Sequence, residues 1–150
     1  MKITNRVLHL EAKPVDFKYP MKNKKMVGQM VKLMQRENGI GLSATQVGLR
    51  HRLFVMQIDG RDWECFNPEL LETSEHWVNF DEGCLSFPGD RCIIQRPEQI
   101  KVKYQNYCGE WSEETLSGLA SRYFQHELDH LHGITMWDRY KEQHAIQSRN

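Results

Sequence analysis

The chain has 150 residues, which is typical of one domain, and its 39% hydrophobic residues are enough to form a core. Twenty Lys and Arg residues balance 20 Asp and Glu residues, and a net charge of zero argues against a basic nucleic-acid module. The sequence shows neither an apolar run of the roughly 20 residues that span a bilayer nor the apolar stretch of a signal peptide. We therefore expect a single catalytic or binding domain over residues 1–150, in the cytoplasm.

The first predicted helix is Asn23–Asn38. Met26, Met30, Leu33 and Met34 recur there at helical spacing between polar residues, and an Asn-Gly pair marks the end. We interpret the three methionines as core residues, because a flexible thioether fills irregular gaps. A glycine-punctuated loop is expected to follow.

Extended segments are predicted in the middle of the chain. The first ends at an Asp-Gly turn. The fourth alternates apolar and polar residues and is joined to the fifth by Cys108-Gly109-Glu110, as in a hairpin. In chain order, these segments are 52–59, 65–71, 77–80, 99–107 and 111–116. A second helix is predicted over Gly118–His132, closed by Gly133. Helix, strands and helix in this order indicate an α+β fold in which helices pack on antiparallel sheet.

The second predicted helix carries an HExxH motif. His126 and His130, at positions i and i+4, lie on one helical face, where both imidazoles can bind one metal ion. Glu127 can then act as a general base toward a water on that metal. The alternative is a surface helix with two ordinary histidines. His132 faces another way and is predicted at the surface, while His144 lies in a polar C-terminal tail.

A catalytic metal centre needs a third protein ligand and an open position. The sequence offers four cysteines without a CxxC pair, so reduced thiols are expected, each by default a small buried residue. Cys84 differs from the other three because it lies between a glycine and a turn-like stretch, in Glu82–Ser86. Cys84, His126 and His130 are therefore the predicted metal ligands, while Cys65, Cys92 and Cys108 keep a structural interpretation.

Three segments closely resemble the signature motifs of the peptide deformylases. These are GIGLSATQ at 39–46, EGCLS at 82–86 and QHELDHLHG at 125–133, and they occur in the family's order and spacing. Ser43 departs from the family's usual alanine, and the family's usual stretch near the N-terminus is missing. The resemblance implies antiparallel sheets packed around a central metal-binding HExxH helix.

The resemblance also implies an activity, the removal of the formyl group from the N-terminal N-formylmethionine of new polypeptides. A metal-bound hydroxide is the implied nucleophile, and Glu127 is the implied general base and acid. The side-chain amide of Gln46 and the backbone N–H of Leu85 would stabilise the oxyanion. For Gln46, the alternative is a polar loop residue that satisfies its own turn.

Substrate contacts are implied in the same way. The backbone near Ile40, Gly41 and Gly83 would pair with the peptide as an added strand. Other implied contacts are Arg91 beside the peptide backbone and an apolar methionine pocket with Ile40, Leu85, Tyr123 and Phe124 as candidates. Arg96 and Asp129 are candidates for orienting the ligands. Tyr123 and Phe124 have a plain core role as their alternative.

The mixed sulfur and nitrogen ligand set suits Zn(II), Fe(II), Co(II) or Ni(II), and the resemblance favours Fe(II) in the cell. The expected substrates are N-formylmethionyl peptides and nascent chains, with no membrane and no direct nucleic-acid partner. Because the longer C-terminal helical extension of many bacterial members is missing, ribosome tethering is doubtful. The short chain resembles a phage-type form, in the cytoplasm of a bacterium or an infected bacterial host.

Two other hypotheses compete with deformylation. A zinc endopeptidase would also use HExxH, but it would be indifferent to Cys84. An inactive metal-binding homologue would bind formyl-peptide without hydrolysing it, and the intact Gln46, Cys84 and Glu127 argue against this.

Overall fold

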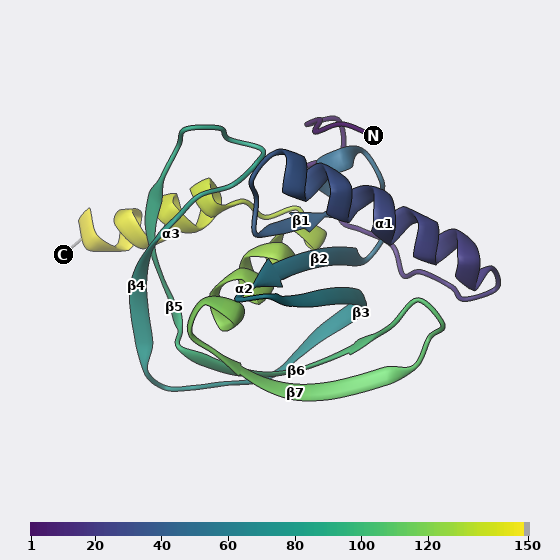
Figure 1. Cartoon of the computed structure of the whole chain (residues 1–150). Coiled ribbons are helices and arrows are strands. Elements are labelled where there is room, and N and C mark those ends of the chain that lie inside the picture. Colours follow the sequence, from purple (N-terminus) through teal and green to yellow (C-terminus); the bar gives the residue numbers. More distant parts are fainter. Residues whose placement is uncertain (149–150) are drawn as a thin grey trace.

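A computed structural model describes residues 1–148 of the chain. Its strands form one five-stranded antiparallel sheet in the order β1-β2-β3-β6-β7 and one two-stranded antiparallel sheet of β4 and β5. Figure 1 shows helix α2 in the centre of the molecule, with strands on several sides of it. The predicted α+β fold is confirmed. The elements are α1 (Pro20–Arg36), β1 (Gly41–Ser43), η1 (a 3-10 turn, Ala44–Val47), β2 (Leu53–Ile58), β3 (Arg61–Thr73), β4 (Trp77–Glu82), β5 (Cys92–Pro97), β6 (Gln99–Gln105), β7 (Trp111–Ser117), α2 (Gly118–Leu131) and α3 (Met136–Ser148).

Helix α1 begins three residues before its predicted start, because Pro20 occupies a first-turn position that needs no N–H donor. It ends before Asn38, whose backbone adopts a left-handed conformation with φ of 58°. The predicted apolar positions Met30, Leu33 and Met34 are buried, and Met26 is partly buried. The face of α1 that carries these side chains is therefore part of the core.

The hairpin between β2 and β3 forms where the sequence predicts it. Ile58 pairs with Arg61, so Asp59 and Gly60 make a two-residue loop, and both have positive φ, as a type I′ turn requires. Strand β3 is longer than the predicted segment, because bulges let it curve along β6 without ending. Strands β6 and β7 form the second predicted hairpin.

Three elements have no counterpart in the prediction. Strand β1 lies in the stretch that was expected to be loop, β5 lies in a stretch for which no element was predicted, and α3 lies where a polar tail was expected. Helix α3 packs on β5 through the buried side chain of Met136. Its Gln143 side chain also exchanges two hydrogen bonds of 2.9 Å with the backbone of Gln95. These contacts come from a distant strand, so the local sequence does not reveal them.

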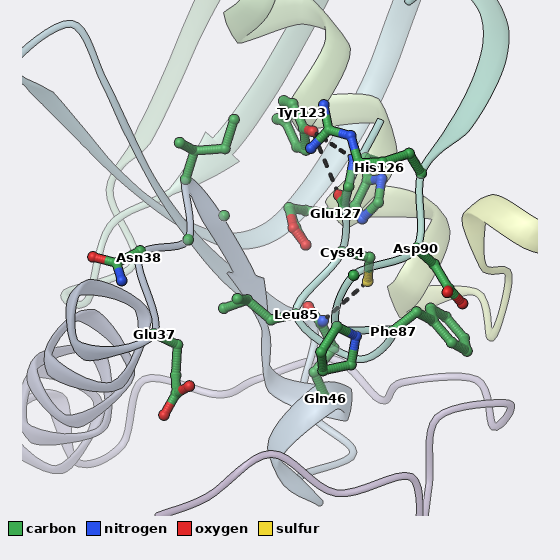
Figure 2. A pocket seen from close by; sticks show the side chains of 17 residues that line it. Glu37, Asn38, Gln46, Cys84, Leu85, Phe87, Asp90, Tyr123, His126 and Glu127 are labelled. Carbon is green, nitrogen blue, oxygen red and sulfur yellow. Dashed lines mark hydrogen bonds between the residues drawn. The ribbon is translucent and has the colours of Figure 1, made fainter. Parts of the chain in front are cut away.

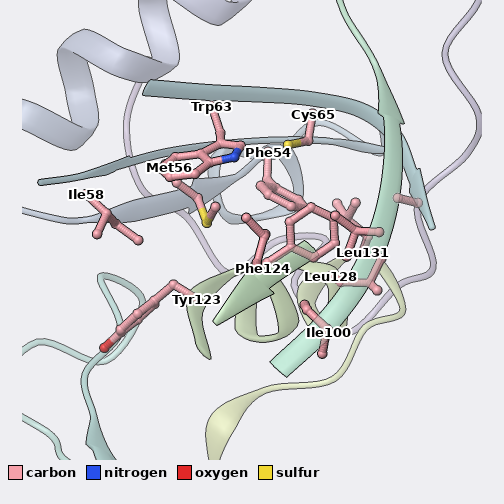
Figure 3. Packing of buried hydrophobic residues seen from close by; sticks show 13 residues of the cluster. Phe54, Met56, Ile58, Trp63, Cys65, Ile100, Tyr123, Phe124, Leu128 and Leu131 are labelled. Carbon is pink, nitrogen blue, oxygen red and sulfur yellow. The ribbon is translucent and has the colours of Figure 1, made fainter. Parts of the chain in front are cut away.

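Helix α2 is buried from Ser121 to Leu131, polar residues included. Its apolar side chains pack on the five-stranded sheet, and the rings of Phe124 and Phe54 meet edge to face at 4.9 Å between centroids (Figure 3). The helix is followed by Gly133, where a Cβ would lie 2.7 Å from the carbonyl oxygen of His9. Only glycine fits this approach, which fixes the end of α2 against the N-terminal segment. None of the helices among residues 1–148 is both long and apolar enough to cross a membrane.

Candidate active site

Helix α2 and the loop after β4 bring three metal-binding side chains together. His126 and His130 follow one another along α2, with ring centroids 5.0 Å apart, and both are buried. Cys84 reaches them from the loop, and its Sγ lies 3.4 Å from Nε2 of His130. One donor atom from each residue lies within 4.8 Å of the others. The predicted ligand set is thus assembled in one place, although Cys84 is more than 40 residues before the two histidines in the chain.

This donor set fits a divalent transition metal. One thiol and two imidazoles are ligands that Zn(II), Fe(II), Co(II) and Ni(II) accept. Nδ1 of His126 is bonded to a carboxylate at 2.8 Å, so Nε2 is the nitrogen left for a metal. Burial, together with the charges of His126 and Arg96, lowers the pKa of His130 well below its usual value. Neutral imidazole is the form of histidine that binds metal.

Glu127 points into the same space with one oxygen unpartnered. Its Oε2 is one of two buried side-chain polar atoms in the described part of the chain without a hydrogen-bond partner, the other being Nδ1 of His130. The Ser43 hydroxyl lies 3.0 Å from the Glu127 carbonyl oxygen and 3.4 Å from Oε1. Burial raises the pKa of Glu127 to about 7, although His126 and the Ser43 hydrogen bond oppose the shift. A carboxyl group with such a pKa takes up and releases protons near neutral pH.

Glu82 is the carboxylate that holds His126, and the sequence reasoning gave it no role. It is fully buried at the end of β4. Besides Nδ1 of His126, it accepts hydrogen bonds from Arg96 at 2.6 and 3.1 Å and from Arg122 at 2.9 Å. Burial alone would raise its pKa, but His126 and Arg96 outweigh burial and hold the pKa well below its usual range. Its position in the EGCLS segment, two residues before Cys84, is the sequence signal that could have revealed this role.

The ion pairs continue from Arg96 to the far side of α2. Nη1 of Arg96 donates to Asp129 at 2.8 Å, and Asp129 also accepts two hydrogen bonds from Arg139 on α3. The prediction that Arg96 and Asp129 orient the site therefore has a structural basis, since Arg96 touches both Asp129 and the carboxylate behind His126. We call Glu82, Arg96, Arg122, Asp129 and Arg139 the ion network.

Gln46 is almost fully buried on η1, next to the cysteine. Its oxygen accepts a hydrogen bond of 2.9 Å from the Ser43 N–H, while its amide nitrogen lies 3.0 Å from the Ser86 hydroxyl and 3.5 Å from Cys84 Sγ. The alternative interpretation, a polar loop residue that hydrogen-bonds only within its own turn, accounts for the Gln46 side-chain oxygen but not for its amide nitrogen. The nitrogen points toward the cysteine. The backbone N–H of Leu85 has no hydrogen-bond partner among residues 1–148.

A cavity of about 460 Å³ opens beside these groups (Figure 2). It is lined by most of the predicted substrate contacts, namely Ile40, Gly41, Gly83, Leu85, Arg91 and Tyr123. Phe124 is a correction, because it is fully buried in the core and does not line the cavity. The reason is helical geometry: one residue along a helix turns by about 100°, so Tyr123 and Phe124 cannot share a face.

The remaining predicted residues lie outside the cavity. His132 is exposed beside Glu11, and His144 stacks on Tyr140 of α3, so neither joins the metal-binding group. All four cysteines are free thiols. Cys65 and Cys92 are buried as expected, whereas Cys108 is exposed in the turn between β6 and β7, which corrects the expectation of burial.

A cysteine and the two histidines of HExxH, gathered at one end of a cavity on an α+β scaffold, define a metal-dependent hydrolase. A sequence profile of the polypeptide deformylase family matches residues 1–145. The chain belongs to this family. It is a deformylase, an enzyme that removes the formyl group from nascent chains in a metal-dependent reaction.

Individual relatives agree with the family assignment. The chain is 46% identical to a peptide deformylase of Thermotoga maritima over 133 residues, which cover 89% of this chain and 80% of the relative. It is 38% identical to a peptide deformylase of Dictyoglomus turgidum over 145 residues, covering 97% and 94% of the two chains. The crystal structure of Thermotoga maritima peptide deformylase superposes with a TM-score of 0.88 at 43% identity, covering 93% of this chain and 97% of that one.

Proposed function

We propose that Cys84, His126 and His130 hold one divalent metal ion, with Fe(II) as the ion used in the cell. The observation that carries this proposal is the gathering of the three donor atoms within 4.8 Å, with His126 held from behind by a carboxylate. Zn(II), Ni(II) and Co(II) suit the same donors. When bound, such an ion acts as a Lewis acid that activates water and polarises a carbonyl group.

We assign proton transfer to Glu127. Its unpartnered Oε2 faces the cavity and accepts a proton from the attacking water, then delivers it to the nitrogen of the departing amine. The carboxyl is buried, so bulk water does not compete for this oxygen. Ser43 holds the other oxygen and leaves Oε2 directed toward the substrate.

The two donors that face the formyl oxygen are the Gln46 side-chain amide and the Leu85 backbone N–H. Gln46 has a rigid position, because the Ser43 N–H holds its oxygen on the opposite side. Leu85 offers an N–H that bonds to nothing else among the described residues. Donors fixed before the reaction stabilise developing negative charge without reorganising, and one such donor is typically worth about 10²–10³ in rate.

The peptide enters as an extended strand along Gly41 and Gly83, which both line the cavity. The Tyr123 hydroxyl lies 3.2 Å from the Gly83 nitrogen and 3.4 Å from its oxygen, and a peptide strand that pairs with Gly83 takes its place. Ile40 and Leu85 supply apolar surface for the methionine side chain, and Arg91 lies at the rim, where Asp81 fixes it. The substrates are N-formylmethionyl nascent chains, in the cytoplasm of a bacterium or an infected host.

The experiment is a formate-release assay on Fe(II)- or Ni(II)-loaded protein, with formyl-Met-Ala-Ser and acetyl-Met-Ala-Ser in parallel. Formate release without acetate release is the expected result. Glu127→Gln should lose turnover and keep its metal, measured by elemental analysis, whereas Glu75→Gln on an exposed loop should behave as the wild type. Full turnover by Glu127→Gln would show that the assigned base is wrong.

A further inference from the structure

The charges of the chain are divided unequally along its length. Residues 1–52 carry 11 Lys and Arg against three Asp and Glu, which gives a net charge of +8. Residues 53–150 carry nine Lys and Arg against 17 Asp and Glu, which gives −8. The neutral total therefore hides two parts of opposite sign. The net charge of zero therefore does not exclude nucleic-acid binding by the first 52 residues, because binding depends on the local field.

The positive charge is concentrated along one side of α1. Residues spaced alternately by three and four positions lie on one side of a helix, since a turn takes 3.6 residues. Following this spacing from the first turn gives five positions, Lys22, Lys25, Gln29, Lys32 and Arg36, and all of them except Gln29 are basic. All five are exposed. We call Lys22, Lys25, Lys32 and Arg36 the basic stripe. Lys18, which precedes the helix, borders the same surface hollow as Lys22 and so lengthens the row of positive charge.

Carboxylates do not neutralise the basic stripe. Helix α1 contains no Asp or Glu. Within residues 1–148, the stripe has one ion pair, Arg36 with Glu37 at 3.8 Å, and both side chains are largely exposed, so it is a weak contact. Like charges three and four residues apart destabilise a helix by about 0.2–0.5 kcal/mol per pair. The basic stripe therefore lowers the stability of α1, and stabilising the fold is not the reason for it.

The stripe leads to the entrance of the catalytic cavity. Its last member, Arg36, shares a surface hollow with Leu85, and the next residues, Glu37 to Gly39, line the cavity. Figure 1 shows α1 on the outside of the molecule, crossing over β1 and β2. A molecule bound along the stripe would therefore lie next to the place where the peptide enters.

The chemistry of the stripe selects among polyanions. It is a straight row of about 21 Å, because a helix rises about 1.5 Å per residue, and the neutral Gln29 lies between the charges of Lys25 and Lys32. A membrane-binding helix needs a free apolar face, but Met30, Leu33 and Met34 are buried in the core. A row of exposed cations instead suits the line of phosphates along a nucleic acid, each lysine acting as a point charge. The substrate is a nascent chain, which is attached to RNA while it is being made.

We propose that the basic stripe of α1 binds the phosphate backbone of RNA, independently of sequence, and holds the cavity beside the RNA-attached substrate. Four phosphate contacts give a slope of about −3 to −4 in the plot of log affinity against log salt concentration. Binding of this kind is weak at physiological salt and is strengthened at low salt. It adds to the hydrolytic function and does not depend on the metal.

The test is fluorescence anisotropy of a labelled 20-base-pair RNA duplex at 50, 100 and 200 mM KCl. The stripe variant carries Lys22→Gln, Lys25→Gln and Lys32→Gln. The matched control carries Lys101→Gln, Lys103→Gln and Lys141→Gln, which changes the net charge equally on the other part of the chain. We expect the stripe variant to lose at least tenfold in affinity at 100 mM KCl, and its salt slope to fall by about 3. The control should stay within twofold.

Several outcomes would overturn the proposal. They are absence of wild-type binding at 50 mM KCl, equal losses in the two variants, or equally tight binding to phosphatidylglycerol vesicles or to poly-glutamate. Formate release from formyl-Met-Ala-Ser, measured on all three proteins, separates this test from that of the hydrolytic function. It should be unchanged in both variants, since none of the substituted residues lines the cavity.

Discussion

Gly41 stands directly against the proposed general base, and a methyl group added there would meet the Glu127 side chain first. A Cβ at Gly41 would lie 2.8 Å from Oε2, 3.0 Å from Cδ and 3.1 Å from Cγ of Glu127. Comfortable contacts are about 3.5–4.0 Å, so Gly41→Ala must push the carboxylate away by roughly half to one ångström. Glu127 is buried on a packed helix and cannot move without losing its contact with Ser43.

A displacement of about 1 Å in a catalytic group lowers turnover about 10²-fold. We therefore expect kcat for formate release by Gly41→Ala to fall about 10²-fold, while the metal content stays at that of the wild type. Gly28→Ala is the matched control, because nothing lies within 4 Å of a Cβ at Gly28 on α1. It should keep full kcat and raise the free energy of unfolding by about 0.5–1 kcal/mol. Wild-type kcat in folded, metal-loaded Gly41→Ala would refute the assignment of Glu127.

Three other substitutions test the surroundings of the site. Glu82→Gln leaves buried guanidinium groups without their carboxylate, so urea unfolding should show a loss of about 3–5 kcal/mol, and elemental analysis should show weaker metal retention. Phe124→Ala should lower the free energy of unfolding by about 3–5 kcal/mol in the same assay without changing KM, since this ring is in the core. A raised KM would show that Phe124 contacts the substrate. Burial tends to raise the pKa of Glu114, but hydrogen bonds from Tyr104, Arg61 and Trp63 outweigh it and lower the pKa. A lowered carboxyl pKa stabilises the fold above the unfolded value of about 4.3, and this stabilisation is lost as pH falls through the folded pKa. Stability of the wild type should thus decline more steeply below pH 4.3 than that of Glu114→Gln, and parallel declines would contradict this.

The sequence was most informative where one local rule decides the structure. The i, i+4 spacing placed His126 and His130 on one face of a helix, and the Asp-Gly pair at residue 59 placed a two-residue turn. Both results depend on neighbours in the chain. The role of Glu82 depends on where the end of β4 meets α2, which is a contact between residues 44 positions apart. Helix α3 was missed for the same reason, because its support comes from β5 and not from its own polar sequence.

The ion network explains why a helix as polar as α2 is buried. Buried ion pairs seldom add net stability, because losing water costs each charge about as much as its partner returns. The remaining contribution of these ion pairs is to orient the side chain of His126. The Glu82 carboxylate fixes which nitrogen of His126 faces Cys84, and Arg96 fixes Glu82 while bonding to Asp129 one turn further along the same helix. The backbone of α2 and the imidazole are therefore held by the same guanidinium group. A metal ligand held in this way keeps its direction when the cavity fills and empties, and catalysis requires that precision more than the fold requires the ion pairs.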